Sequence, residues 1–116
     1  MTRATLSAKT LIGDAVKNSQ GEDLGQIEEL MIDIDQGRVA YAVLSPGGTL
    51  GIGSKLFAIP WEALTVDTEN KRFVLDIPRE KLEKAPGFDK DNWPDFSSRE
   101  WQTEIYRYYG YEPYWG

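Results

Sequence analysis

The chain has 116 residues, which is enough for one domain with one modest core. It carries 13 basic and 19 acidic residues, for a formal net charge of −6, and contains neither cysteine nor histidine. These missing residue types exclude disulfides, cysteine-based zinc sites and the Ser-His-Asp and Cys-His catalytic arrangements from this chain alone. Because the basic residues are scattered among more numerous acids, we expect no direct binding to nucleic acid or to anionic lipid.

No apolar run approaches the roughly eighteen residues that a membrane-spanning helix needs. The first residues, Met1–Lys9, lack the continuous apolar segment of a signal peptide. We therefore expect a cytoplasmic location without membrane insertion. The absence of histidine and cysteine further favours a protein that is not an enzyme and that has no cofactor and no metal centre.

Alternating apolar residues predict strands through the first two thirds of the chain. In the segment 28–35, Leu30, Ile32 and Ile34 share one face, and a β-bulge near Glu28 and Glu29 would bring Ile27 onto that face as well. The next strand, 38–44, has two apolar faces and is expected to be central and covered on both sides. Further strands are expected at 56–59, 64–67 and 72–77, the last two joined by a polar hairpin.

This pattern predicts a mainly β fold, a small barrel of about six strands over residues 1–78. Its expected core consists of Leu30, Ile32, Val39, Tyr41, Val43, Phe57, Ile59, Phe73 and Leu75. Residues 79–116 are expected to form a helical, aromatic-rich extension packed on the barrel. Proline begins a short helical segment at 78–84, and a second helix follows a capping box at 97–100 and ends near Gly110.

Ten of the fourteen aromatic residues lie between Phe88 and Gly116. We expect Trp93, Trp101 and Ile105 to complete the barrel core, because a barrel of this size buries little area by itself. The surplus at Tyr109, Tyr111, Tyr114 and Trp115 is expected to form an apolar patch that contacts a protein partner or a second copy of the chain.

Two polar segments suggest ligand sites. The Gly-rich segment Gly47–Lys55 lacks both the lysine directly after its last glycine and the following helix of a phosphate-binding loop, so we expect a flexible inter-strand loop without nucleotide affinity. The sequence leaves open whether this loop contacts another ligand. It also leaves open whether Asp89, Asp91 and Asp95 hold a cation, although proline replaces the required glycine of a calcium loop at position 94.

Glycines and turn residues punctuate the β-patterned runs in a fixed order. The runs are Leu11–Asn18, Gly21–Ile27, Ile32–Val39, Ser45–Gly48, Gly51–Lys55 and Ala58–Trp61. This order resembles the PRC-barrel family, which includes the cytoplasmic domain of the photosynthetic reaction-centre H subunit and the C-terminal domain of the ribosome maturation factor. The C-terminal tail is similar to those of stand-alone bacterial members. The resemblance implies a small β-barrel and no catalytic residues.

The resulting functional hypothesis is a non-enzymatic adaptor that binds a protein partner, expected as a homodimer, with a possible link to H-subunit-like roles. One alternative is an accessory factor of RNA metabolism and ribosome maturation that acts through a ribosomal protein. Another is a small-ligand-binding barrel that uses carboxylates and the Gly-rich loop.

Overall fold

The computed structural model describes residues 5–46 and 55–113. In chain order the elements are α1 (Ala8–Leu11), β1 (Ala15–Lys17), β2 (Asp23–Asp33), β3 (Arg38–Pro46), β4 (Lys55–Pro60), the 3-10 helix η2 (Trp61–Ala63), β5 (Leu64–Asp67), β6 (Arg72–Leu75), α2 (Arg79–Glu83), β7 (Phe88–Asp89) and α3 (Arg99–Tyr108). The strands form one sheet in the order β5-β6-β1-β2-β3-β4-β7. The fold is therefore mainly β, as predicted.

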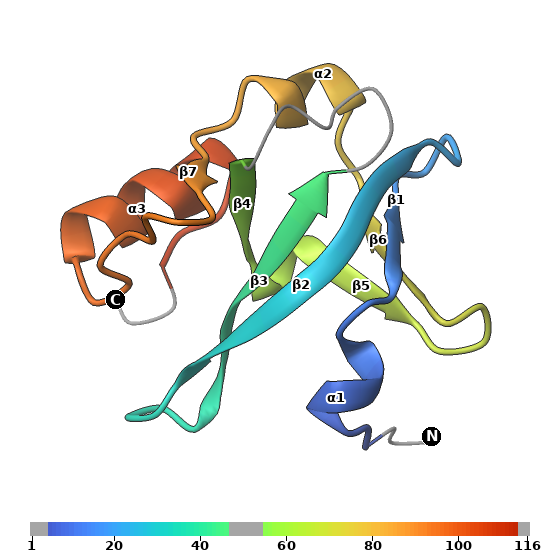
Figure 1. Ribbon diagram of the computed structural model, residues 1–116, viewed down its shortest axis with the longest axis horizontal. Coiled ribbons are helices and arrows are strands. Elements are labelled where there is room, and N and C mark those ends of the chain that lie inside the picture. Colours follow the sequence, from blue (N-terminus) through green and yellow to red (C-terminus); the bar gives the residue numbers. More distant parts are fainter. Residues whose placement is uncertain (1–4, 47–54, 114–116) are drawn as a thin grey trace.

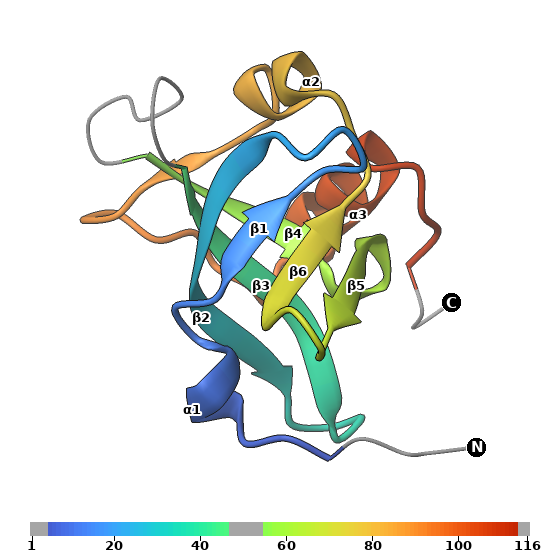
Figure 2. The same ribbon diagram turned by 90° about the vertical axis from the view of Figure 1, so that its right-hand side faces the viewer.

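The sheet curls around a single core, and α3 packs beside β4 (Figures 1 and 2). Neighbouring strands are antiparallel except β1 and β6, which pair in parallel from Ala15 opposite Arg72 to Lys17 opposite Val74. Six strands belong to the expected barrel, and β7 comes from the C-terminal extension, where Phe88 pairs with Leu56 of β4. The extension thus contributes a strand as well as helices.

The long strand β2 contains two register shifts against β3. The first lies between Ile27 and Glu29, which confirms the predicted bulge and leaves Ile27 buried at 1% exposure. The second lies between Met31 and Ile32. Beyond it the β2–β3 hairpin projects past the rest of the sheet (Figure 1). The prediction that Ile32 belongs to the core is therefore wrong, because its side chain is 54% exposed.

Strand β3 is covered on both faces, as its two apolar faces predicted. Tyr41, Ala42, Val43 and Leu44 are all at most 1% exposed. The other residues of the predicted barrel core, apart from Ile32, are also buried or packed against the buried cluster. Of the extension residues expected to complete this core, Ile105 is buried and Trp101 packs against the cluster, whereas Trp93 is 39% exposed, so the prediction for Trp93 is wrong. The residues of this cluster from the barrel and those from the extension form one continuous core.

Helix α3 begins and ends with side-chain and backbone caps. Ser98, one residue later than predicted, is the N-cap and accepts a hydrogen bond from the Trp101 amide at 3.4 Å. At the other end, the Gly110 amide donates to the Arg107 carbonyl and the Tyr111 amide donates to the Tyr106 carbonyl. This is a Schellman motif, and Gly110 supplies its positive φ of 85°. The predicted helix end is confirmed.

Over residues 5–46 and 55–113, every helix is too short or too polar to cross a lipid bilayer.

Candidate functional site

The projecting part of the β2–β3 hairpin, residues 31–38, is here named the hairpin arm. It carries two large exposed apolar side chains, Ile32 at 54% and Ile34 at 88% exposure. The turn at its tip is well defined. Asp33 accepts hydrogen bonds from the Gln36 amide through Oδ1 at 3.1 Å and from the Gly37 amide through its carbonyl oxygen at 2.8 Å. The arm therefore presents its isoleucines on a fixed backbone.

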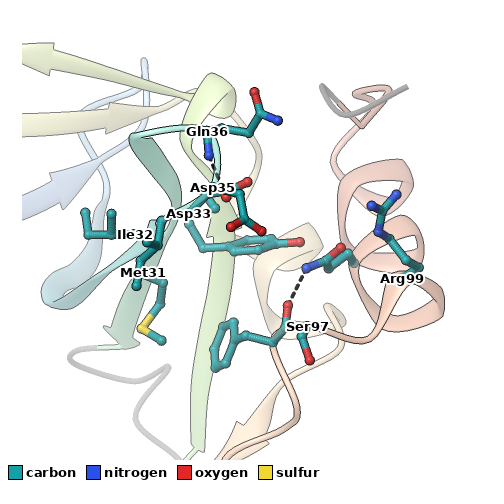
Figure 3. Close-up of a pocket in the computed structure, with 12 residues that line it drawn as sticks. Met31, Ile32, Asp33, Asp35, Gln36, Ser97 and Arg99 are labelled. Atoms are coloured by element: carbon teal, nitrogen blue, oxygen red, sulfur yellow. Dashed lines mark hydrogen bonds between the residues drawn. The ribbon is translucent and has the colours of Figure 1, made fainter.

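A cleft of about 450 Å³ lies between the hairpin arm and the start of α3 (Figure 3). The arm forms one wall, and the segment before α3 together with its first turn forms the other. The lining residues are Met31, Ile32, Asp33, Ile34, Asp35, Gln36, Ala40, Tyr41, Phe96, Ser97, Arg99 and Gln102. Concave surfaces with mixed apolar and polar walls are common binding sites in proteins.

Aromatic rings support the base of this cleft. Tyr41 contacts Phe96 at a ring-centroid distance of 5.8 Å and Trp101 at 5.5 Å, and Phe96 lies 4.8 Å from Trp101. The Gln102 side chain donates a hydrogen bond to the Phe96 carbonyl and ties the wall to α3. Edge-to-face aromatic contacts add about 0.5–1.5 kcal/mol per pair beyond their buried area. This wall is therefore stabilised by its own packing.

Charge is distributed unevenly across the cleft. Asp33 and Asp35 stand on the arm, and Arg99 stands on the opposite wall (Figure 3). Beside that wall, the hydroxyl and the amide of Ser97 both donate hydrogen bonds to Asp95 Oδ1. These bonds, mainly that of the hydroxyl, hold the pKa of the Asp95 carboxyl below its usual value. Asp95 is thus kept ionised and fixes the turn that leads into α3.

Of the expected partner-binding residues, Tyr109 and Tyr111 are described, and neither lines this cleft. Tyr109 was expected in an exposed patch, but it is only 5% exposed because it follows Ile105 by one helical turn and shares its buried face. Burial raises the pKa of the Tyr109 phenol. Tyr111 is 38% exposed, and Tyr114 and Trp115 lie outside the described residues. A partner-binding role for this set stays a prediction.

The structure describes the acidic segment with Asp89, Asp91 and Asp95, but only the last residue of the Gly-rich segment. Asp89 Oδ1 accepts the Asp91 amide at 2.9 Å, so this carboxylate caps its own turn, as that of Asp95 does. Within the described residues, acidic side chains form no group of three or more that could hold a metal ion. Of the Gly-rich segment, residues 47–54 lie outside the described part, and Lys55 is exposed at the start of β4.

The sequence pattern did not indicate the hairpin arm as a site. The alternation of Leu30, Ile32 and Ile34 predicts one buried face, and the first of these is indeed buried at 8% exposure. The available signal was the position of Ile34, which directly precedes the turn at Asp35. An apolar residue that continues a strand pattern into a tight turn has few neighbours available to cover it.

The fold and the site together define a small β-barrel domain with an aromatic helical extension and an exposed apolar hairpin. A model of the PRC-barrel domain matches residues 4–82. The chain therefore belongs to the PRC-barrel family, as the order of its glycine and turn signals indicated.

One solved structure that matches part of this chain is described as the 16S ribosomal RNA processing protein RimM from Pseudomonas aeruginosa. The two share 15% sequence identity with a TM-score of 0.48, and the match covers 65% of this chain. It spans 45% of the length of that protein. A comparison with curated proteins found no match.

Proposed function

We propose that the chain is a non-enzymatic adaptor of the cytoplasm that binds a protein partner through the hairpin arm and the adjoining cleft. The observation that carries this proposal is the exposure of Ile34 at 88% and Ile32 at 54%. Single exposed apolar residues are common on protein surfaces. Two isoleucines on one hairpin, beside a concave surface, form a larger apolar feature than isolated residues do.

The physical basis is the apolar area that a partner would remove from water. Burying apolar surface yields about 25 cal/mol per Å², so two covered isoleucine side chains supply several kcal/mol of gross binding energy. Met31 and Phe96, both partly buried, extend the apolar surface from the arm into the cleft. A partner that covers the arm can therefore insert a side chain into the cleft at the same time.

The test is co-purification from the native host with a tagged full-length chain. The double variant Ile32→Ser/Ile34→Ser should lose the proteins that the unaltered chain retains. A matched control is Ile12→Ser, which removes an isoleucine that is 38% exposed and does not line the cleft. Retention of the same proteins by the double variant, at unchanged stability, would show that the arm is not the binding surface.

The identity of the retained proteins separates the alternatives. Ribosomal proteins would favour an accessory role in ribosome maturation, and membrane or photosynthetic proteins would favour an H-subunit-like role. Retention of a second copy of the chain alone would favour the homodimer, which sedimentation of the purified protein measures directly. Co-purification of a small molecule, with no protein retained, would favour the ligand-binding alternative.

A further inference from the structure

We propose that the cleft selects a partner segment that is basic as well as apolar, with a lysine or arginine side chain entering between the hairpin arm and α3. This inference rests on the proposed function, because it names the chemistry of the partner at the same site. It follows from the charges around the cleft, from the apolar surface beside them and from the size of the cavity.

The charge of the lining is negative. Asp33 and Asp35 contribute two carboxylates, and Arg99 is the single basic side chain among the lining residues that the structure describes. Glu28 and Glu29 add two exposed acids farther along β2. The chain as a whole carries −6. An acidic surface of this kind attracts cationic segments and disfavours anionic ones.

The arm also carries one basic residue, Arg38, which lies opposite Asp33 in the register of β2 and β3. Arg38 Nη2 lies 2.8 Å from Glu62 Oε2 on η2, and this carboxylate offsets its charge. The arm therefore presents more negative than positive charge to the cleft.

The apolar surface suits the stem of a long cationic side chain. Lysine and arginine place their methylene groups along apolar surfaces while keeping the charged head near water or a carboxylate. Here Met31 and Phe96 line the cleft that also contains the carboxylates of the arm. A volume of about 450 Å³ accommodates such a side chain with an aliphatic neighbour. A second copy of this chain is a less suitable partner, because it also carries a net charge of −6 and the acidic lining of the cleft would repel it.

Calorimetric titration of the full chain with two amphipathic peptides tests this inference. One probe alternates leucine and lysine, and its twin alternates leucine and glutamate. The lysine peptide should bind more tightly than the glutamate peptide, and its affinity should fall as NaCl rises from ~0.05 M to ~0.5 M, because salt screens exposed charges. Equal binding of both peptides, or no binding of either, would overturn the inference.

A charge-matched pair of variants localises the effect. Asp33→Asn/Asp35→Asn should weaken binding of the lysine peptide by roughly three- to tenfold, the range expected for exposed ion pairs. Asparagine at position 33 retains the carbonyl oxygen that accepts the Gln36 amide. The control Glu69→Gln/Glu104→Gln removes two exposed acids elsewhere and should leave the affinity unchanged. An equal loss in both double variants would mean that net charge alone attracts the peptide.

The failures of the two proposals are distinguishable. If Ile32→Ser/Ile34→Ser loses the native partner while the peptides show no charge preference, the arm is a binding surface and the charge inference is wrong. If that variant retains the native partner, the arm is not the binding surface, and the charge inference is wrong as well if Asp33→Asn/Asp35→Asn binds the lysine peptide as tightly as the unaltered chain does.

Discussion

Apolar residues are buried in one half of β2 and exposed in the other half and the turn that follows it. In the half that pairs with β1 as well as β3, Ile27 is 1% exposed and Leu30 is 8% exposed. In the half that continues into the hairpin arm, Ile32 is 54% exposed and Ile34 is 88% exposed. Only β3 pairs with this second half among the described strands. Burial of an alternating face thus depends on what lies opposite it, which the strand pattern itself does not specify.

The largest expected difference between the halves is the cost of removing an isoleucine. Ile27→Ala should lower the free energy of unfolding by roughly 2–5 kcal/mol, because it leaves a cavity in the core. Ile34→Ala should change it by less than about 0.5 kcal/mol. Urea titration measures both. Similar losses for the two variants would mean that the arm is covered in solution, for example by a second copy.

Glycines in the buried half of β2 and at the tip of the hairpin arm offer a second comparison. Gly25 has a φ of +137°, and a Cβ there would lie 2.1 Å from the Ser45 carbonyl oxygen across the strand pair. Gly25→Ala should therefore cost roughly 2–4 kcal/mol through strain and overpacking. Gly37, at the tip, has a φ of +65° with nothing within 4 Å, so Gly37→Ala should cost only about 1 kcal/mol. Thermal unfolding should rank the two, and a larger cost at Gly37 would contradict the described register.

The contact between α3 and the covered strand β3 should be of intermediate importance. The buried hydroxyl of Tyr106 lies 3.2 Å from the Ala40 carbonyl and 3.1 Å from Glu62 Oε1. Tyr106→Phe should lower the free energy of unfolding by about 1–2 kcal/mol, because it removes a buried hydrogen-bonding group. Tyr111→Phe, at a 38% exposed position, is the control and should be nearly neutral. Equal stability of both variants in guanidinium would show that this hydroxyl does not hold α3 in place.

The smallest effect is expected at the base of the arm. Arg38 and Glu62 form an ion pair at 2.8 Å, and both side chains are about a third exposed. A double-mutant cycle with Arg38→Ala and Glu62→Ala should give a coupling energy below about 1 kcal/mol, decreasing with added salt. A coupling energy of several kcal/mol would contradict this expectation and would mean that the ion pair fixes the direction of the arm.

Much of the barrel was predictable from local signals. Ile27 broke the parity of its strand and thereby indicated the bulge, and the two apolar faces of 38–44 indicated a central strand. The second register shift, between Met31 and Ile32, left no such signal, because the alternation continues through it. The exposed arm was therefore missed, and with it the cleft.

The extension was predicted in outline, but the exposure of Trp93 and the burial of Tyr109 were not. Gly110 correctly marked the end of α3. Tyr109 was grouped with the residues after it, although its spacing of four from Ile105 places both on one helix face. The number of aromatic residues in this segment does not by itself distinguish the buried face from the exposed one. The burial of Tyr109 depends on α3 packing across the core, a contact between distant segments that a local pattern does not reveal.

The parallel pairing of β1 and β6 has a consequence for how the chain folds. Ala15 and Arg72 stand opposite each other, and the Asn18 side chain donates to the Ile77 carbonyl across 59 positions of sequence. The hairpins β2–β3 and β5–β6 connect neighbouring segments and can form early, whereas joining β1 to β6 requires closing a long loop first. We therefore expect the pairing of β1 with β6 to limit the folding rate. Until β6 has formed, β1 has an unpaired edge.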